Sequence, residues 1–535
     1  MNLVKPLIEY FPEGYTPRPH QITGLEKLDA SLRKEAKFII IQAPTGSGKS
    51  FISKTLSNIT RECDNEYQRL VFNYYAFDED YAGAIAKLPP HGLFALTTTK
   101  ALQNQYKDLF NESSIFKGKS NYQCDIDNSL TTEHAPCLIS PKQKKECWDD
   151  HCCPYYESRN SALIEKFAVL NYASFFNLPN HLKKRQILVA DECSELEDEI
   201  VKYYSAEIDY RRLTVNNIEF DKLTSEVPAK ALGWLTDLAG NVQKAIEDHK
   251  GRARYENNKI ELIKQQFRKD LYESIINIID HWDKTQYIIE KDGEKATFTP
   301  LKIDTLTHCL FDYADTVILM SATIVDKNIF AKTLGIKDFE YIEFESTFDP
   351  KKSPIYCHSK YPLNYKTLEN NLPPVVDITH SVAEKHKGEK GIIHTHSFAI
   401  TQAVQKKLKG KRFLYREEGT TNEIIIKEHT LRKDDTVLVS PSLTMGLDLK
   451  GDLGRWQVII KMPYPSLASK RIKKLFEIDS SWYRMKMFIS LIQACGRCTR
   501  SAEDESTTYI LDGTSVKTII DNRHVLPKHF LDRIM

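Results

Sequence analysis

Short apolar runs rich in β-branched residues recur along the chain, and polar or small residues follow each of them. Runs that stay apolar instead of alternating are typical of parallel strands buried on both faces. Stretches with helical spacing lie between the runs, for example at 50–61 and 398–409. This alternation predicts an α/β fold with helices on both faces of parallel sheets. The runs are Lys37–Ala43, Gln186–Ala190, Thr316–Met320, Gly391–His396, Thr436–Pro441, Gln457–Lys461 and Thr508–Asp512.

Two segments interrupt this alternation, and we interpret both as insertions into the first α/β domain. The first, at 102–176, holds five of the eleven cysteines. The second, at 201–307, is mostly charged and shows helical spacing between residues 257 and 282. The plainest interpretation of this second segment is a helical connector with a solvated face.

Length and composition bound the class of protein. The chain has 535 residues, of which 41% are hydrophobic and 27% charged, so it can bury real cores. At roughly 150 residues per domain, this length suggests about three or four domains. The formal net charge is +1. That value excludes a highly basic, histone-like binder but not an enzyme with a local basic groove.

The sequence indicates a cytoplasmic protein. No apolar run approaches the roughly 18 residues that a membrane span needs. The first 14 residues include Glu9 and Glu13 and lack an uninterrupted apolar stretch, so we expect no signal peptide and no membrane partner. Cysteines in such a compartment are expected to stay reduced or to hold a metal.

A phosphate-binding loop follows the first apolar run. The segment 43–50 reads Ala-Pro-Thr-Gly-Ser-Gly-Lys-Ser, although Ala43 stands where the strict motif has its first glycine. Glycines there let successive backbone N–H groups face a phosphate. Lys49 would reach the β and γ phosphates of ATP, and the Ser50 hydroxyl would bind Mg²⁺. The predicted ATP and Mg²⁺ ligands here are Thr45, Gly46, Ser47, Gly48, Lys49 and Ser50.

A pair of carboxylates ends the second apolar run. Asp191 would hold Mg²⁺ through water, and Glu192 would polarise the water that attacks ATP. A strand that ends in a solvated acidic turn would look the same in isolation. Together with the phosphate loop, the pair predicts an ATP-hydrolysing site.

Two arginines near the C-terminus lie three residues apart. Arg497 and Arg500 would share one face of a helix. From there they could reach a γ-phosphate across a cleft and stabilise the charge of the transition state. Alone, such a pair would more often be solvated on a surface helix.

The ordered set of motifs resembles the superfamily 2 helicases, and its details resemble the DinG/XPD branch of iron–sulfur helicases. The resemblance runs from about Arg18 to Asp512. It implies two RecA-like P-loop motor domains, with a cysteine-rich iron–sulfur insertion and a helical arch insertion in the first. The motifs that carry it are residues 18–21, 43–50, 97–103, 117–124, 153–156, 171–172, 191–192, 321–323, 345–348, 446–451, 460–463 and 493–500.

The resemblance also implies a role for each matching residue. Gln21 would read the adenine edge, and Gly446 and Asp448 would lie in the cleft between the motor domains. The loop of Thr98, Thr99 and Lys100 would contact the DNA backbone. Ser321 and Thr323 would couple the state of ATP to the DNA path. Gln493 would lie beside the γ-phosphate, with Arg497 and Arg500 as arginine fingers. The implied direction of movement on single-stranded DNA is 5′ to 3′.

One departure from the family concerns the residue after the two carboxylates. The usual Asp-Glu-Ala-His is here Asp191-Glu192-Cys193-Ser194. Ser194 can donate and accept a hydrogen bond but does not titrate near neutral pH. We expect hydrolysis to survive, whereas coupling of hydrolysis to strand movement is less secure.

The clustered cysteines form the pattern C-x12-C-x9-C-x4-C-C. Structural zinc sites usually show two close pairs, so zinc fits this spacing poorly, although zinc or an empty remnant stays open. An iron–sulfur cluster accepts looser spacing. The resemblance implies a [4Fe–4S] cluster whose last ligand directly precedes Pro-Tyr, which favours Cys153 over Cys152. The predicted ligands are Cys124, Cys137, Cys147 and Cys153.

Taken together, the sequence predicts an ATP- and Mg²⁺-dependent DNA helicase. Its partners would be single-stranded and forked DNA, or an RNA–DNA hybrid, and it would act as a monomer in the cytoplasm, at a nucleoid or in a viral host. An alternative is an ATPase that moves on DNA and remodels protein–DNA complexes without unwinding. The predicted ranges are 1–101, 177–200 and 308–330 for motor domain 1, 102–176 for the cluster domain, 201–307 for the arch and 331–535 for motor domain 2.

Overall fold

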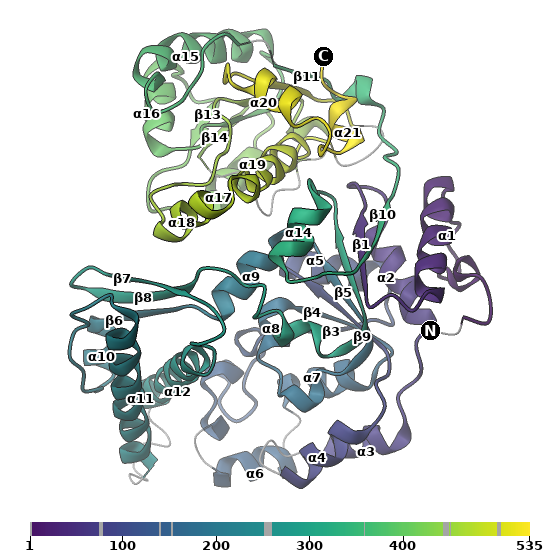
Figure 1. Cartoon of the computed structure of the whole chain (residues 1–535), viewed down its shortest axis with the longest axis vertical. Coiled ribbons are helices and arrows are strands. Elements are labelled where there is room, and N and C mark those ends of the chain that lie inside the picture. The colour runs from purple at the N-terminus through teal and green to yellow at the C-terminus, as the bar shows by residue number, and fades with distance from the viewer. Residues whose placement is uncertain are drawn as a thin grey trace.

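The structure is a computed structural model that describes residues 3–73, 79–138, 141–150, 153–250, 259–357, 359–441, 449, 451–499 and 504–535. Two α/β units lie one above the other along the long axis, and two smaller units extend from the lower one (Figure 1). We call them the first α/β unit, the second α/β unit, the cysteine-rich unit (117–164) and the arch unit (206–300). Both small units are inserted between strands of the first α/β unit.

The first α/β unit is built on a seven-stranded sheet in the order β10-β1-β9-β5-β2-β4-β3. Every pairing in this sheet is parallel, as the continuous apolar runs predict. The strands are β1 (Phe38–Gln42), β2 (Leu93–Thr97), β3 (Ser114–Phe116), β4 (Phe167–Asn171), β5 (Arg185–Asp191), β9 (Ala314–Ser321) and β10 (Glu340–Glu343).

The second α/β unit has a six-stranded sheet in the order β11-β16-β15-β12-β14-β13, again parallel throughout. The predicted α/β class with parallel sheets is therefore confirmed. The strands are β11 (Ile355–Tyr356), β12 (Gly391–His394), β13 (Phe413–Tyr415), β14 (Val437–Ser440), β15 (Trp456–Ile459) and β16 (Thr507–Ile510).

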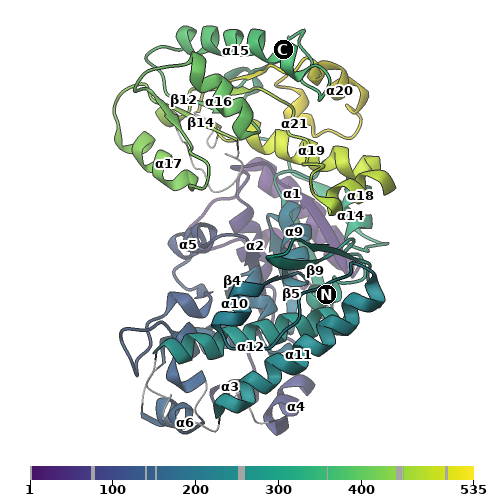
Figure 2. The same cartoon turned by 90° about the vertical axis from the view of Figure 1, so that its left-hand side faces the viewer.

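The arch unit differs from a purely helical segment. Two long antiparallel helices lie against a three-stranded antiparallel sheet in the order β6-β8-β7 (Figure 2). Strand β8 alternates half-buried and buried residues, the pattern of a strand with one face on a core. The elements are β6 (Ala206–Asp209), α10 (Tyr210–Val215), α11 (Pro228–Lys250), α12 (Lys259–Asp280), β7 (Tyr287–Lys291) and β8 (Lys295–Pro300).

Helices cover both faces of the two parallel sheets. In the first α/β unit they are α1 (Pro19–Arg33), α2 (Lys49–Asn58), α3 (Asn65–Asn73), α4 (Glu79–Lys87), α5 (Lys100–Leu109), α8 (Tyr172–Phe176), α9 (Leu196–Tyr203), α13 (His308–Phe311) and α14 (Lys327–Thr333). In the second they are α15 (Leu368–Lys385), α16 (Phe398–Lys407), α17 (Asn422–Leu431), α18 (Lys470–Ile478), α19 (Ser480–Cys495), α20 (Ser515–Asp521) and α21 (Lys528–Leu531). The cysteine-rich unit contains α6 (Pro141–Asp150) and α7 (Pro154–Ile164).

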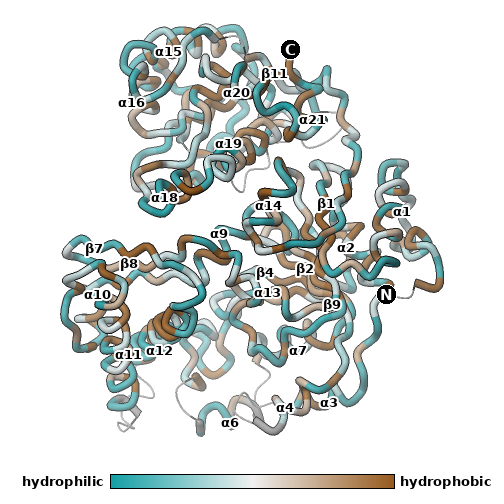
Figure 3. Tube along the Cα trace, in the orientation of Figure 1, coloured by the Kyte–Doolittle hydropathy of each residue, from teal (hydrophilic) through white to brown (hydrophobic). Residues whose placement is uncertain are grey.

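Hydrophobic residues concentrate on the strands of the parallel sheets (Figure 3). One buried cluster runs from the lower face of the first sheet, around Leu188 and Leu319, to α18 and α19 of the second α/β unit. The two units therefore share a buried apolar contact. Among the helices that the structure describes, none is long and apolar enough to cross a lipid bilayer.

The edge of the first α/β unit lies beyond the predicted boundary at residue 330. Residue 330 falls inside α14. Strand β10 follows this helix and pairs in parallel with β1, so the first unit extends at least to residue 343. The carboxyl ends of β1, β5 and β9 lie side by side in the sheet, which is where binding sites form in parallel sheets.

Candidate functional site

The phosphate loop connects the end of β1 to the start of α2. Gly46 and Gly48 adopt φ angles of +81° and +85°, a region that favours glycine. A Cβ on Gly48 would lie 2.3 Å from the side-chain nitrogen of Gln21. The loop thus requires glycine at these positions, and Lys49 and Ser50 open the helix that follows.

Residues just before and inside α1 hold this loop from the side. Gln21 Nε2 donates to the Ser47 carbonyl at 3.0 Å, and Gln21 Oε1 accepts from the backbone N–H of Arg18 at 2.9 Å. His20 also contacts the Ser47 carbonyl at 3.2 Å, and Arg18 donates to the carbonyl of Gly46 at 3.3 Å. The Gln21 amide therefore binds the phosphate loop here, and reading of an adenine edge stays a prediction.

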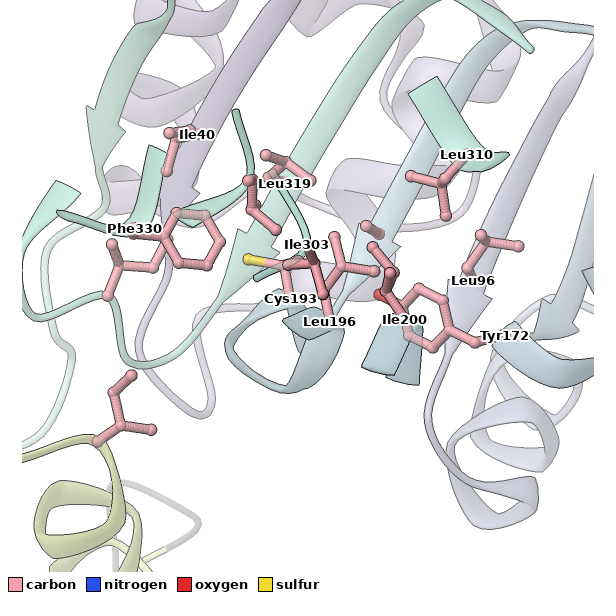
Figure 4. Packing of buried hydrophobic residues seen from close by; sticks show 14 of the residues in the cluster. Ile40, Leu96, Tyr172, Cys193, Leu196, Ile200, Ile303, Leu310, Leu319 and Phe330 are labelled. Carbon is pink, nitrogen blue, oxygen red and sulfur yellow. The ribbon is translucent and has the colours of Figure 1, made fainter. Parts of the chain in front are cut away.

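The two predicted catalytic carboxylates lie at the end of β5, opposite Lys49. Lys49 Nζ and Glu192 Oε1 form an ion pair at 2.8 Å. Glu192 has a φ of +53°, a strained backbone conformation that persists only where surrounding structure enforces it. Cys193 and Leu196 supply that support, because both side chains are fully buried in the apolar cluster beneath the turn (Figure 4).

Asp191 is held by two tyrosines to which the sequence analysis gave no role. Its Oδ2 accepts from Tyr106 Oη at 3.0 Å, and its backbone carbonyl accepts from Tyr172 Oη at 3.0 Å. Burial is the main cause that raises the pKa of Asp191 to about 6, while the charge of Lys49 and the Tyr106 hydrogen bond oppose this shift. Both tyrosines come from other elements, so no local pattern links them to Asp191.

A chain of hydroxyl contacts joins the two α/β units behind these carboxylates. Ser321 Oγ, at the end of β9, lies 3.4 Å from Glu192 Oε2 and 3.0 Å from Ser194 Oγ. Gln493 Nε2, on α19 of the second unit, donates to Ser194 Oγ at 3.5 Å. Thr323 is buried and its N–H donates to Ser321 Oγ at 3.3 Å. The structure thus brings together residues from three separate motifs, at 191–194, 321–323 and 493–500.

Arg497 follows α19 and faces the same turn. Its positive charge acts on Glu195, whose pKa burial raises to about 7. It also acts on His394 at the end of β12, whose pKa burial lowers to about 4. The predictions for Gly446, Asp448 and Arg500 lie outside the described residues.

A cavity of about 400 Å³ opens beside the phosphate loop and is lined by Lys49, Ser50, Asp191 and Glu192. Aromatic side chains form its other wall. Phe11 and Phe51 stack with ring centroids 5.6 Å apart, and Tyr15 meets Phe51 edge-on at 4.8 Å. An aromatic wall of this kind suits stacking of the flat base of a nucleotide. The sequence analysis missed Phe11 and Tyr15, because scattered aromatics carry no motif.

The predicted DNA loop lies at the carboxyl end of β2. Thr99 caps α5, since its hydroxyl accepts from the N–H of Leu102 at 3.3 Å. Lys100 is exposed and Thr98 half-buried. The loop lies at the same end of the sheet as the phosphate loop, and its contact with DNA stays a prediction.

The comparisons with known proteins agree with this geometry. Residues 380–526 match the family described as helicase C-terminal domain, and residues 14–217 match the family described as type III restriction enzyme, res subunit. The chain is 20% identical over 521 residues to the ATP-dependent DNA helicase XPD of Sulfolobus acidocaldarius, covering 89% of this chain and 92% of that one. The chain is an XPD/DinG-like superfamily 2 helicase.

Solved structures share the fold of this helicase along nearly its whole length. An XPD helicase structure superposes with a TM-score of 0.64 at 17% identity, covering 97% of this chain and 99% of the other. The structure of Xpd4 from S. tokodaii superposes with a TM-score of 0.55 at 13% identity, covering 94% of this chain and 98% of the other.

The four predicted cysteine ligands of this helicase gather in one small buried cluster. Cys124, Cys137 and Cys147 pack with Leu130, Ala135 and Leu262, and Cys153 lies against them. Thiol contacts run from Cys137 to Cys147 and from Cys147 to Cys153. The Cys137 contact raises the pKa of Cys147 to about 12, and the Cys153 contact opposes this shift. The competing Cys152 lies outside the described residues.

These thiols do not converge on one point. In the described ranges, no group of three or more His, Cys, Asp or Glu side chains is placed to hold a single metal ion. An iron–sulfur cluster takes one thiolate on each of several irons, so its ligands surround a larger volume. The unit thus offers four clustered thiols, three of them buried, as a donor set for a metal site, and the [4Fe–4S] cluster stays a prediction.

Proposed function

We propose that this helicase uses ATP and Mg²⁺ to move 5′ to 3′ along single-stranded DNA and to unwind duplex. The observation that carries the proposal is the contact chain from Lys49 through Glu192, Ser321 and Ser194 to Gln493, which spans both α/β units. A nucleotide bound at the phosphate loop would meet groups from both units. The two units would then act as motor domains that close and open with each ATP.

The mechanism starts with an exchange of partners at Lys49. In the structure, Lys49 pairs with Glu192. A γ-phosphate beside the loop would draw the ammonium group away and leave the Glu192 carboxylate to accept a proton from water. Asp191 and Ser50 would hold Mg²⁺, which neutralises phosphate charge when bound. Arg497 would approach the same phosphate from the second motor domain and stabilise the transition state.

Hydrolysis would reach the DNA path through the shared serines. Ser321 touches Glu192 directly, and the strand that carries it runs beside β1 and β5. A shift of the Glu192 carboxylate would therefore alter the contacts that link Ser321, Ser194 and Gln493. Thr98, Thr99 and Lys100 directly follow β2, the strand next to β5. DNA bound by these residues would therefore lie near the catalytic carboxylates.

The cysteine-rich unit would separate the strands. Cys124, Cys137, Cys147 and Cys153 would hold a [4Fe–4S] cluster, which would staple a unit too small for a large core. The chemistry that it supplies is structural, namely four thiolate bonds that fix loops from distant sequence positions. A rigid unit of this kind beside the arch could act as a wedge at the fork.

A second candidate function is a translocase that remodels protein–DNA complexes without unwinding. The observation that favours it is the long hydrogen bond between Ser194 and Gln493. The two side chains are 3.5 Å apart, whereas Ser194 lies 3.0 Å from Ser321. A weak link between the motor domains would let ATP hydrolysis continue while strand separation fails.

A strand-displacement assay with anaerobically prepared protein tests the proposal. One duplex carries either a 5′ or a 3′ single-stranded tail, and we expect ATP-dependent displacement only with the 5′ tail. Lys49→Ala is the inactive control, because the phosphate loses its cation. DNA-stimulated hydrolysis without displacement would favour the translocase. Displacement only from the 3′ tail, or turnover by Lys49→Ala, would contradict the polarity or the site.

A further inference from the structure

Three units of this helicase meet at the start of α18. Arg471, only 6% exposed, donates from Nη2 to Glu197 Oε1 at 2.7 Å and from Nε to the carbonyl of Pro300 at 2.9 Å. Glu197 belongs to α9 of the first α/β unit, whereas Pro300 ends β8 of the arch unit. One guanidinium group of the second α/β unit therefore binds both other units at once.

The buried carboxylate at this junction is fully engaged. Glu197 is 6% exposed, and besides Arg471 it accepts from Trp482 Nε1 at 3.0 Å and pairs with Lys486 at 3.4 Å. Lys486 also pairs with Asp198 at 2.9 Å. Two carboxylates thus face two cations, so the charge is balanced. Removing one partner would leave a buried charge uncompensated, which is why such a contact persists while exposed contacts break.

The residue before Arg471 extends the contact to the arch. Lys470 Nζ lies 3.1 Å from a Glu226 carboxylate oxygen and 4.0 Å from one of Glu290. Both acids belong to the arch unit, and the side chain of Lys470 is 52% exposed. Figure 1 shows α18 on the side of the upper unit that faces β7 and β8.

The far side of the arch rests on the cysteine-rich unit. Leu262 of α12 packs in the same cluster as the buried cysteines. Lys269 donates to the carbonyl of Leu138, and Lys259 pairs with Asp127 at 3.8 Å. The arch therefore spans from α18 to the cysteine-rich unit.

Position in the chain ties this junction to the nucleotide. Glu197 stands five residues after Glu192, on the helix that follows the catalytic turn. Asp479 caps α19 directly after α18 ends, and α19 carries Gln493. Gln493 and Arg497 are therefore joined to α18 through one continuous helix, α19.

We propose that Arg471 and Lys470 couple the movement of the second α/β unit to the arch unit. When ATP closes the two motor domains, α18 turns about the Glu197 contact and draws the arch with it. The arch then shifts relative to the first α/β unit, into which it is inserted. This inference rests on the proposed motor function, and Arg471 acts in it as a positioning residue.

Fluorescence energy transfer between dyes on the full chain tests the coupling. Dyes attached through unnatural amino acids at exposed Lys27 and Asp237 report the distance from the first unit to the arch. Dyes at Lys27 and Lys406 report the distance from the first to the second unit. We expect both distances to change when Mg²⁺ and a non-hydrolysable ATP analogue are added. If neither changes, the motor proposal fails; if only the second changes, the coupling alone fails.

Variants separate the coupling from folding. Lys470→Glu repels Glu226 and Glu290 at an exposed position, and we expect it to reduce the arch shift at least two-fold while the motor-domain shift stays intact. Arg471→Met should abolish the arch shift, and Arg471→Lys should restore the melting temperature but not the shift. The control is Lys332→Met, since Lys332 and Asp479 form an exposed ion pair across the same two units at 3.0 Å. Full arch shifts in Lys470→Glu and Arg471→Met would overturn the proposal.

Discussion

Asp191 shows how burial and hydrogen bonding compete at one residue. Its carboxyl group is buried, which favours the neutral form and raises the pKa to about 6. The hydrogen bond from Tyr106 opposes this, because it stabilises the ionised form. Mg²⁺ binds a carboxylate, so protonation of Asp191 competes with the metal.

Mg²⁺ affinity in this helicase should therefore weaken as pH falls through about 6, the pKa of the Asp191 carboxyl group. Tyr106→Phe removes a hydrogen bond to a charged group, which typically contributes about 1.5–3 kcal/mol. Its loss raises the pKa of Asp191, so the acid limb of the ATPase profile at low Mg²⁺ should move to higher pH.

The matched control is Tyr172→Phe, because Tyr172 donates to the backbone carbonyl of Asp191 and not to the carboxylate. Tyr172→Phe should leave the acid limb of the ATPase pH profile unchanged. An identical pH profile for Tyr106→Phe and the unaltered protein would rule out this role.

At the scale of elements, the phosphate loop depends on backbone freedom as much as on side chains. Gly48 combines a positive φ with close contact to Gln21. Local sequence predicts the strand before the loop and the helix after it. It does not predict that the Gln21 side chain binds the loop.

Gly48→Ala should lose ATP binding almost completely. The φ of +85° costs an L-residue roughly 1–2 kcal/mol, and the new methyl group would lie 2.3 Å from Gln21 Nε2. Binding of a fluorescent ATP analogue measures the loss. Gly388→Ala, with φ +91° and open space around it, controls for backbone strain alone and should bind ATP normally. Normal binding by Gly48→Ala would refute the geometry of the loop.

The cysteine-rich unit carries a prediction of its own. Protein purified without oxygen should be brown and hold about four irons per chain. Cys137→Ser should lower the iron content and the protease resistance of residues 117–164, while Cys63→Ser should not. Cys63 lies outside the buried cysteine cluster, which makes it the appropriate control. Colourless protein with one metal per chain would instead indicate zinc.

At the scale of the whole molecule, the apolar contact between the two α/β units restricts how they can move. The shared cluster includes Ile303 of the first unit and Leu475 and Trp482 of the second. It lies beside the Glu197–Arg471 pair, so the buried contact and the ion pair form one joint. We therefore expect movement to concentrate at the nucleotide site and at the arch, which the dye measurement reports.

Local pattern in the sequence determined the α/β class, the strands before the two key motifs and the residues Lys49, Asp191 and Glu192. Each of these depends on neighbours within a few positions, since strands buried on both faces are apolar throughout and their motifs follow at the ends. The same local view placed Ser321 and Gln493 in separate motifs without showing that Ser194 joins them.

Tertiary structure alone decided the contacts between distant segments. Tyr106 meets Asp191 across 85 positions, and Arg471 meets Glu197 across 274. It also decided that β10 completes the first sheet and that the arch contains a sheet. The physical reason is that such contacts satisfy buried polar groups with whichever partner the fold brings near, and a partner so far away leaves no periodicity in the chain.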